Sequence, residues 1–286
     1  MATLALHAYH GRLAARFAAA GIEDADGEAR LLLCHVLGCS FSRFFLEADR
    51  PVGAAEYRVL EEAARRRLDR EPLAYILGSR EFYGRDFTVT PAVLIPRPET
   101  ELLVEQAVAW WRAMPAAGGR ILDCGTGSGA IAVTLALELA ACSVYAVDVA
   151  ADALAVAAGN ARRHRAEIVP VRADLRRLPF AAGAFRCIVA NLPYIPSGEI
   201  AGLMPEVAGF EPRLALDGGP TGTELFSEIF PGLDAALVGG GGMFFEIGHD
   251  QEDFFHGFFR ARPGYHACRV LRDYAGLPRL VQVLKR

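Results

Sequence analysis

The pattern of apolar and polar positions divides the chain into a helical first part and a mixed second part. Up to about Gly78 the chain combines Ala- and Leu-rich stretches with an apolar block behind acidic residues, and helices are predicted over residues 4–20, 23–37 and 54–69. Gly38 is placed to end the second of these helices. We predict that residues 1–78 form a small N-terminal helical domain.

The third of these helices carries a run of charges. Glu61 and Glu62 stand ahead of three arginines at positions 65–67. Opposite charges three and four positions apart support a helix surface, so we interpret this run as a solvent-exposed face. Residues 1–78 hold ten Arg against eleven Asp plus Glu, so a partner of this segment must be recognised by shape as well as by charge.

Residues 79–98 differ in composition from the helical part. Aromatic and β-branched residues surround Gly84 between positions 81 and 90, which predicts a β-hairpin. Prolines follow at positions 91, 96 and 98, and we place the linker between two domains here. A helix is then predicted at residues 99–112.

From Arg120 onward, short apolar strands alternate with helices. Strands are predicted at residues 120–124, 143–149, 167–172, 185–190, 242–247, 265–272 and 279–285, and helices at residues 129–140, 152–164, 199–207 and 222–238. This alternation predicts a mostly parallel sheet covered on both faces, and the short turn at 274–278 predicts an antiparallel last strand. The fold class is therefore α/β, with a seven-stranded Rossmann-like domain over residues 99–286.

Composition narrows the class of protein. The 286 residues are 52% hydrophobic and 22% charged, which is ordinary for a soluble globular protein. The net charge of −4 gives no global reason to expect nucleic-acid or membrane binding. The apolar stretch 130–147 contains Thr134, Glu138 and Ser143, so we assign it to the core of the domain instead of a membrane span.

The six cysteines form no Cys-x-x-Cys pair, and several lie inside apolar runs. This usage is typical of reduced, buried thiols in a cytosolic protein. No histidine cluster suggests a metal site, and the N-terminus has no secretory-signal architecture. We expect a cytoplasmic monomer that holds no metal.

A glycine-rich loop marks the start of the second part. The sequence Asp-Cys-Gly-Thr-Gly-Ser-Gly at residues 123–129 follows the first predicted strand and opens a helix. Glycines let the backbone turn tightly and approach a ligand closely. Mononucleotide, dinucleotide and adenosyl-methionine sites all use such loops, but a P-loop is excluded because no Gly-Lys-Ser/Thr follows.

Carboxylates stand at or just after the ends of the first three predicted strands of this part. Asp123 ends the first, and Asp148 ends the second, where it could accept hydrogen bonds from a ribose diol. Asp174 follows the third, where it or its backbone neighbours could meet an adenine amino group. A dinucleotide-dependent dehydrogenase remains an alternative on the glycines alone.

A tetrapeptide follows the fourth strand, Asn191-Leu192-Pro193-Tyr194. The Asn191 side chain offers a carbonyl acceptor, and a Pro-containing turn can aim a backbone carbonyl at the same point. The Tyr194 ring could lie flat against a planar group. These features together predict a holder for an NH2 group conjugated to a π system, in an amide or a nucleobase.

The glycine loop combined with this tetrapeptide resembles the class I adenosyl-methionine-dependent methyltransferases. Further segments resemble, in order, those of the peptide chain release factor N5-glutamine methyltransferases, and they span roughly residues 28–286. These segments are Glu-Pro-Leu-Ala-Tyr-Ile-Leu-Gly (71–78), Arg-Glu-Phe-Tyr-Gly (80–84), Leu-Ile-Pro-Arg-Pro-Glu-Thr-Glu (94–101), Phe-Glu-Pro-Arg-Leu-Ala-Leu-Asp-Gly-Gly (210–219), Phe-Glu-Ile-Gly (245–248) and Arg-Asp-Tyr-Ala-Gly (272–276).

The resemblance implies a fold, an activity and a set of site residues. The family joins a helical substrate-recognition domain through a hairpin linker to a methyltransferase domain, and it methylates the Gln of the Gly-Gly-Gln motif in class 1 release factors. S-adenosyl-L-methionine is the implied cofactor and release factors are the implied partners. The cofactor contacts would come from the strand-end and loop residues Asp123, Gly125, Thr126, Gly127, Ser128, Gly129, Asp148, Asp174, Leu175 and Asn191, and the glutamine amide would be held by Asn191, Leu192, Pro193 and Tyr194.

The chain departs from the family pattern at two positions. The usual motif is Asn-Pro-Pro-Tyr, but position 192 is Leu, and Leu175 stands where an aromatic residue is common. The expected contact from position 192 is its backbone carbonyl, which Leu retains, and Pro193 still biases residue 192 toward extended geometry. We therefore expect activity to be retained.

Alternatives remain at the level of sequence. The same chemistry would suit a glutamine of a ribosomal protein or a nucleobase amine, although a nucleobase enzyme should show a basic face, and no direct nucleic-acid binding is expected here. An inactive binding protein of the same fold would be supported only by Leu192. Arg97 and Glu99 either line a substrate entrance or form a salt bridge that fixes the interdomain angle.

Overall fold

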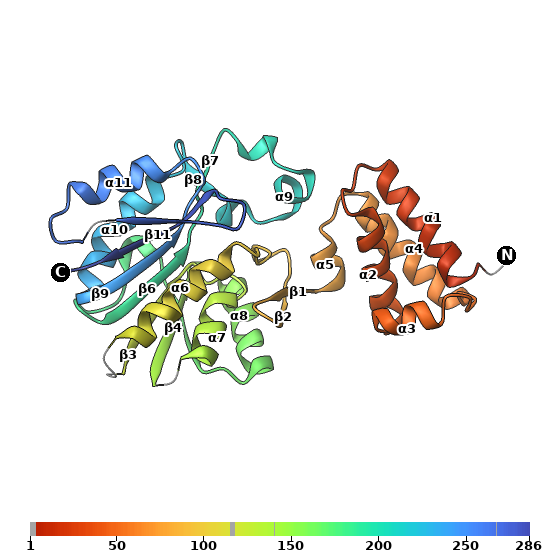
Figure 1. The fold of residues 1–286 in the computed structure, drawn as a ribbon, viewed down its shortest axis with the longest axis horizontal. Helices are drawn as coiled ribbons and strands as arrows, with labels where there is room; N and C mark the ends of the chain where they lie inside the picture. The colour runs from red at the N-terminus through yellow and green to blue at the C-terminus, as the bar shows by residue number, and fades with distance from the viewer. Residues whose placement is uncertain (1–3, 115–117, 140, 267) are drawn as a thin grey trace. The chain divides into compact units, whose positions relative to one another are not determined.

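The computed structural model describes residues 4–114, 118–139, 141–266 and 268–286. Their contacts group them into two units. The first runs up to Gly78 and also includes Met204–Phe210, and the second consists of Ser79–Leu203 and Glu211–Arg286 (Figure 1). In the described residues, no helix is long and apolar enough to cross a membrane.

The first unit is helical, as predicted. Its helices are α1 (Leu6–Ala19), α2 (Ala25–Leu37), α3 (Phe41–Leu46), α4 (Ala54–Leu68), α5 (Leu73–Leu77) and the distant α9 (Pro205–Phe210). The three predicted helices are confirmed, and α2 ends at Gly38 in the left-handed conformation with φ 60°. The short helices α3 and α5 were not predicted, because one or two turns are too short to show the hydrophobic period of a helix.

The interpretation of residues 61–67 as a solvated face is wrong at Arg67. Only 3% of Arg67 is exposed, its guanidinium donates to Glu28 at 2.5 Å (Nε to Oε2), and it pairs with Glu206 of α9 at 2.9 Å. Glu61 accepts from Tyr9 and Arg16 of α1. Because α1, α2 and α9 contribute partners to α4, this charge run forms ion pairs within the unit, as buried charges require.

The second unit begins with the predicted hairpin. Strands β1 (Ser79–Phe82) and β2 (Arg85–Thr88) pair antiparallel. The turn residues Tyr83 and Gly84 have φ of 53° and 70°, the positive values that a tight two-residue hairpin needs. Helix α6 (Thr100–Ala113) follows the linker and confirms the helix predicted at 99–112.

A seven-stranded sheet forms the body of this unit, in the order β10-β11-β9-β6-β3-β4-β5. Its strands are β3 (Gly119–Cys124), β4 (Cys142–Asp148), β5 (Ile168–Arg172), β6 (Phe185–Asn191), β9 (Leu237–Glu246), β10 (Arg269–Arg272) and β11 (Pro278–Leu284). Strand β11 runs antiparallel to both neighbours, whereas β3, β4, β5, β6 and β9 pair in parallel. The predicted α/β, Rossmann-like fold class is confirmed.

Helices cover both faces of the sheet (Figure 1). Along β6, Ile188 and Ala190 pack into the cluster beneath α10 (Glu224–Ala236) and α11 (Glu252–Arg260). Their neighbours Cys187 and Val189 pack into the cluster beneath α6 and α7 (Ala130–Glu138), beside α8 (Ala151–His164). This alternation is the two-residue period of a strand buried on both faces.

Three predicted elements need correction, and one helix was not predicted. The helix at 199–207 is wrong: the chain forms η2 (Ile200–Gly202), breaks, and restarts at α9, whose first residue is Pro205, a residue with no backbone N–H to continue a helix. Strand β9 begins five residues before the predicted 242, because residues 239–242 are glycines that hide its pattern. The strand at 265–272 shortens to β10, with Tyr265 making only an isolated bridge to Lys285. Helix α11 was not predicted.

The remaining strands and helices of this unit agree with prediction to within a few residues. Residue 140 of the predicted helix 129–140 and residue 267 of the predicted strand 265–272 lie outside the described residues. The loops add η1 (Leu175–Arg177), η3 (Arg213–Ala215) and a small two-stranded sheet of β7 (Ile195–Pro196) and β8 (Asp217–Gly219).

Candidate active site

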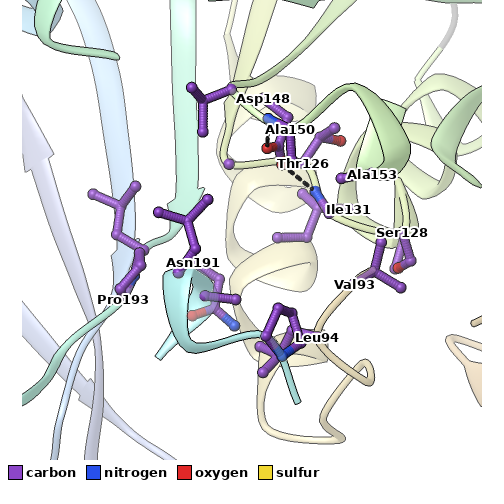
Figure 2. A pocket seen from close by; sticks show the side chains of 18 of the residues that line it. Val93, Leu94, Thr126, Ser128, Ile131, Asp148, Ala150, Ala153, Asn191 and Pro193 are labelled. Carbon is purple, nitrogen blue, oxygen red and sulfur yellow. Dashed lines mark hydrogen bonds between the residues drawn. The ribbon is translucent and has the colours of Figure 1, made fainter. Parts of the chain in front are cut away.

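A cavity opens at the carboxyl ends of the parallel strands (Figure 2). In a doubly wound sheet this edge is where ligands bind. Its lining comes from the segments that follow β3, β4, β5 and β6, from the linker, from the start of α6 and from the loop after α9. The lining residues include Gly125, Thr126, Gly127, Ser128, Asp148, Val149, Ala150, Asp174, Leu175, Arg176, Asn191, Leu192 and Pro193, together with Ala92, Val93, Leu94, Pro96, Thr100, Pro212, Leu214 and Ala215.

The glycine loop adopts a backbone that few other residues tolerate. Gly125, Gly127 and Gly129 have φ of 72°, 54° and 80°, in the left-handed region that glycine enters freely. A Cβ on Gly129 would lie 2.9 Å from the Cβ of Ala157 in α8. Gly129 therefore lets the loop pack against α8, while residues 125–128 line the cavity.

Asp148 ties the loop to the end of β4. Its Oδ2 accepts from the backbone N–H of Gly127 at 3.0 Å, and its Oδ1 accepts from that of Ala150 at 2.9 Å. A carboxylate has about four acceptor positions, so Asp148, which lines the cavity, keeps acceptor capacity for a ligand. The predicted contact with a ribose remains a prediction.

Asp123 is a buried carboxyl group near the end of β3, and its predicted contact with the cofactor remains a prediction. It is fully buried and does not line the cavity in the described part of the chain. Its Oδ2 accepts from the Thr126 hydroxyl at 2.7 Å, and its Oδ1 is buried without a hydrogen-bond partner among the described residues. Burial raises the pKa of Asp123 to about 7; the hydrogen bond from Thr126 opposes this shift and the charge of Asp148 adds to it.

Replacing Asp123 by asparagine should change how stability depends on pH. The native carboxyl has its pKa raised from 3.8 to about 7, so between these values the folded protein holds a proton that the unfolded chain has lost, and stability falls as pH rises. The amide of the Asp123→Asn variant cannot titrate. The free energy of unfolding of the variant, relative to that of the parent, should therefore rise by up to about 4 kcal/mol between pH 4 and pH 8. Denaturant unfolding at both pH values checks this, and a pH-independent difference contradicts it.

Asp174 and Leu175 form the wall beyond β5. Asp174 accepts from the backbone N–H of Arg176 at 2.9 Å and begins η1. Leu175 is 8% exposed and packs in the core cluster while it lines the cavity. It therefore offers an apolar surface beside Asp174, where an adenine is predicted to bind.

Asn191, the last residue of β6, is oriented by two other side chains. Its Nδ2 donates to the Thr100 hydroxyl at 3.1 Å, and that hydroxyl donates to Oε2 of Glu246 at 2.6 Å. Glu246 is 5% exposed, and burial raises the pKa of its carboxyl. Thr100 and Glu246 both stand in segments that resemble the family, but neither could be given a role from the sequence because they lie far from Asn191 along the chain.

Of the other residues in the tetrapeptide, Leu192 and Pro193 line the cavity, whereas Tyr194 contacts Glu246. Leu192, only 7% exposed, lines the cavity and packs into the core, and Pro193 also lines it. Tyr194 is absent from the lining: its hydroxyl donates to Oε1 of Glu246 at 3.3 Å. Its expected stacking on the substrate therefore stays a prediction.

Two glycines and a glutamine hold the tetrapeptide from behind. A Cβ on Gly218 would lie 2.7 Å from the Pro193 carbonyl oxygen, and one on Gly222 would lie 2.2 Å from that of Tyr194. Gln251 donates from Nε2 to the same Tyr194 oxygen at 3.0 Å. The backbone at residues 193 and 194 is thus fixed by close contacts that only glycine permits.

Arg97 is paired, but not with Glu99. Its guanidinium donates to Glu211, whose side chain is 1% exposed and also accepts from the backbone N–H of Ile95 at 3.1 Å. Neither Arg97 nor Glu99 lines the cavity in the described part of the chain. The pair instead joins the linker to the loop that begins at Glu211, and both of these segments contribute apolar wall.

Comparison with known proteins identifies relatives over most of the chain. Residues 11–78 match the family described as PrmC N-terminal domain, and residues 121–210 match the family described as Methyltransferase domain. The release factor glutamine methyltransferase of Chlorobaculum tepidum is 44% identical over 271 residues, covering 92% of this chain and 91% of that protein. The protein of the same name from Geobacter sulfurreducens is 40% identical over 261 residues, covering 91% of this chain and 90% of that protein.

Solved structures resemble smaller parts of the chain. A ribosomal protein L11 methylase from Lactobacillus delbrueckii subsp. bulgaricus covers 69% of this chain and 84% of its own, with a TM-score of 0.49 and 20% identity. TrmN from Thermus thermophilus covers 66% of this chain and 52% of its own, with a TM-score of 0.46 and 26% identity.

Proposed function

The chain belongs to the release factor glutamine methyltransferases, and on that premise we propose that it methylates the side-chain nitrogen N5 of the Gln in the Gly-Gly-Gln motif of class 1 release factors. One observation carries the proposal. Asn191, with its amide nitrogen already bound to Thr100, shares a cavity with the glycine loop of a methyltransferase fold. The alternatives of a ribosomal-protein glutamine or a nucleobase amine have no separate support.

S-adenosyl-L-methionine is the methyl donor, and when bound it supplies an electrophilic methyl group on a sulfonium. The cavity fits such a cation because two acidic residues, Asp148 and Asp174, line it against one basic residue, Arg176. Gly125 and Gly127, whose backbone is in the left-handed conformation, line the same cavity and leave the backbone there uncovered by side chains. We propose that residues 125–128, Asp148 and Leu175 hold the cofactor, with Asp123 and Gly129 supporting the loop from outside the cavity.

The amide nitrogen of a glutamine is a poor nucleophile because its lone pair is delocalised into the carbonyl. Oδ1 of Asn191 and the backbone carbonyl of Leu192 are the acceptors that would take its two hydrogens. They hold the nitrogen in place and favour its pyramidalisation, so positioning supplies much of the rate. No strong base is needed before transfer, since the nitrogen becomes acidic as it gains the methyl group.

We propose that the helical unit recognises the release factor. Its near balance of charge leaves shape and apolar contact as the basis of recognition. Phe45 and Leu46 of α3 and Val59 of α4 are 60%, 86% and 56% exposed, and they supply apolar surface for such a contact. A monomeric state and the absence of direct nucleic-acid binding remain predictions.

The Leu192→Pro variant should remain active within about tenfold of the parent. Both residues present a backbone carbonyl at position 192, but Pro removes the buried Leu side chain, and a large-to-small core change costs about 2–4 kcal/mol. We therefore expect a lower Tm and similar turnover, measured by thermal unfolding and methyl transfer in vitro. If Leu192→Pro switches on activity from an undetectable parent, the tolerance of Leu at this position is refuted.

Mass spectrometry of a release factor incubated with this protein and S-adenosyl-L-methionine tests the proposed function. We expect a mass gain of one methyl group on the Gln of Gly-Gly-Gln. Methylation of another residue, or of RNA, would refute the substrate assignment. Calorimetry with S-adenosyl-L-methionine tests the enzyme class itself, since an inactive scaffold would show no binding.

A further inference from the structure

We propose that Thr100 and Glu246 are positioning residues that hold the Asn191 side-chain amide with its oxygen toward the substrate nitrogen. The inference rests on the proposed function and assigns a role to two residues outside the tetrapeptide. The side-chain amide of asparagine is nearly symmetric in shape, but one end donates hydrogen bonds and the other accepts them. An amide turned by 180° would present NH2 to the NH2 of the glutamine, and two donors cannot bond.

The direction of the hydrogen bonds decides which end faces the cavity. The Thr100 hydroxyl has one proton, and it donates that proton to Oε2 of Glu246 at 2.6 Å. Toward Asn191 the hydroxyl can therefore only accept, and Nδ2 of Asn191 lies 3.1 Å away. Both oxygens of Glu246 accept, Oε2 from Thr100 and Oε1 from Tyr194, so Glu246 fixes the direction of the whole chain of bonds.

The fold holds these residues together. Glu246 is the last residue of β9, and it pairs in register with Asn191, the last residue of β6. Thr100 is the first residue of α6 and is itself 4% exposed. The second oxygen of Glu246 accepts from the Tyr194 hydroxyl, so one carboxylate is bonded to Tyr194 directly and to Asn191 through Thr100.

Valine and serine at position 100 separate positioning from packing. Thr100→Val keeps the shape and removes the hydroxyl, whereas Thr100→Ser keeps the hydroxyl and loses a methyl group. We expect kcat with a release factor to fall about 10- to 100-fold in Thr100→Val, with a KM change below about threefold. In Thr100→Ser, kcat should stay within about threefold of the parent.

The side-chain amide of Asn191 can be observed directly by NMR, because the chain contains only two asparagines, Asn160 and Asn191. Selective ¹⁵N-asparagine labelling of the full chain therefore gives two side-chain NH2 signals. Asn160 donates to the carbonyls of Thr88 and Ser128, and serves as the internal reference. Thr100→Val should move the Asn191 signals and leave those of Asn160, and Thr100→Ser should leave both.

Glu246→Gln supplies a second variant of the same shape. Its carboxamide can donate to Thr100, which frees the Thr100 proton to point at Asn191, so the Asn191 signals should move and kcat should fall as in Thr100→Val. The proposal is overturned if Thr100→Val matches Thr100→Ser in kcat or leaves the Asn191 signals unmoved. If the Thr100→Val variant also shifts the Asn160 signals, the Glu246→Gln variant decides the outcome. A kcat of Glu246→Gln equal to that of the parent overturns the proposal. A shift of the Asn160 signals in both variants also overturns it, because Thr100 and Glu246 would then act in folding alone.

The two proposals fail in different ways. The NMR signals report the orientation of Asn191 whatever the substrate is. If the signals behave as expected and the parent chain does not methylate a release factor, the positioning role stands and the substrate assignment fails.

Discussion

Replacing Asn191 by alanine should lower kcat/KM for release-factor methylation by about 1000-fold, close to 4 kcal/mol of transition-state stabilisation. The change removes Oδ1 of Asn191, one of the two acceptors proposed to orient the glutamine nitrogen. The backbone carbonyl of Leu192 is then the remaining acceptor of the two. Because Asn191 makes a single hydrogen bond to Thr100 among the described side chains, we expect the free energy of unfolding to fall by no more than about 1 kcal/mol.

Turnover, calorimetry and thermal unfolding of the same preparation separate the possible roles of Asn191. Cofactor affinity should change by less than about tenfold, since residues 125–128 and Asp148 are proposed to carry most of that contact. The matched variant Asn191→Asp keeps an acceptor oxygen but cannot donate to Thr100, so its activity should lie between those of the parent and the alanine variant. If alanine at this position costs less than about fivefold, or abolishes cofactor binding, Asn191 does not have the role proposed here.

Replacing Gly222 by alanine should damage stability and activity together. The new Cβ would lie 2.2 Å from the Tyr194 carbonyl oxygen and 2.9 Å from Nε2 of Gln251, and the backbone φ is 79°. Overpacking and a left-handed alanine each cost about 1–3 kcal/mol. We expect Tm to fall by about 6–12 °C, and kcat to fall about 100-fold as the tetrapeptide shifts.

Gly198→Ala is the control, because Gly198 lies between the tetrapeptide and Gly222 in the chain and nothing lies within 4 Å of a Cβ built on it. Its Tm should change by no more than about 3 °C, with parental turnover. Thermal unfolding and a methyl-transfer assay on both variants check the pair. Equal behaviour of the two variants would show that contact between Gly222 and Tyr194 does not hold the site.

Local pattern was enough to locate one side of the cavity. Asp148 and Asn191 each end a strand in the sequence pattern, and the carboxyl ends of neighbouring parallel strands meet at one edge of a sheet, so their proximity follows from the fold class. The loop at residues 125–129 could be placed because its glycines mark a turn between a strand and a helix. The hairpin around Gly84 was visible for the same local reason.

The burial of charged side chains could not be predicted from the sequence. The full burial of Asp123 is visible only in the packing of its neighbours, and its predicted contact with the cofactor stays a prediction. Arg67 belongs to a charge run that periodicity places on a surface, yet α9, more than one hundred residues away in the sequence, supplies Glu206 as a partner. Burial depends on which distant element packs against a residue, and a local window of sequence does not contain that element.

The sequence alone therefore determined the fold class and the place of Asn191 at a strand end, because spacing, turn residues and strand ends are local properties. Through its resemblance to a family it also indicated the methyltransferase chemistry. The tertiary structure decided which residues hold that asparagine in place. Thr100 lies 91 positions from Asn191 and 146 positions from Glu246, and each bond between them is a contact between separate elements. The direction of those bonds depends on side-chain protons that meet only when β6, β9 and α6 pack together.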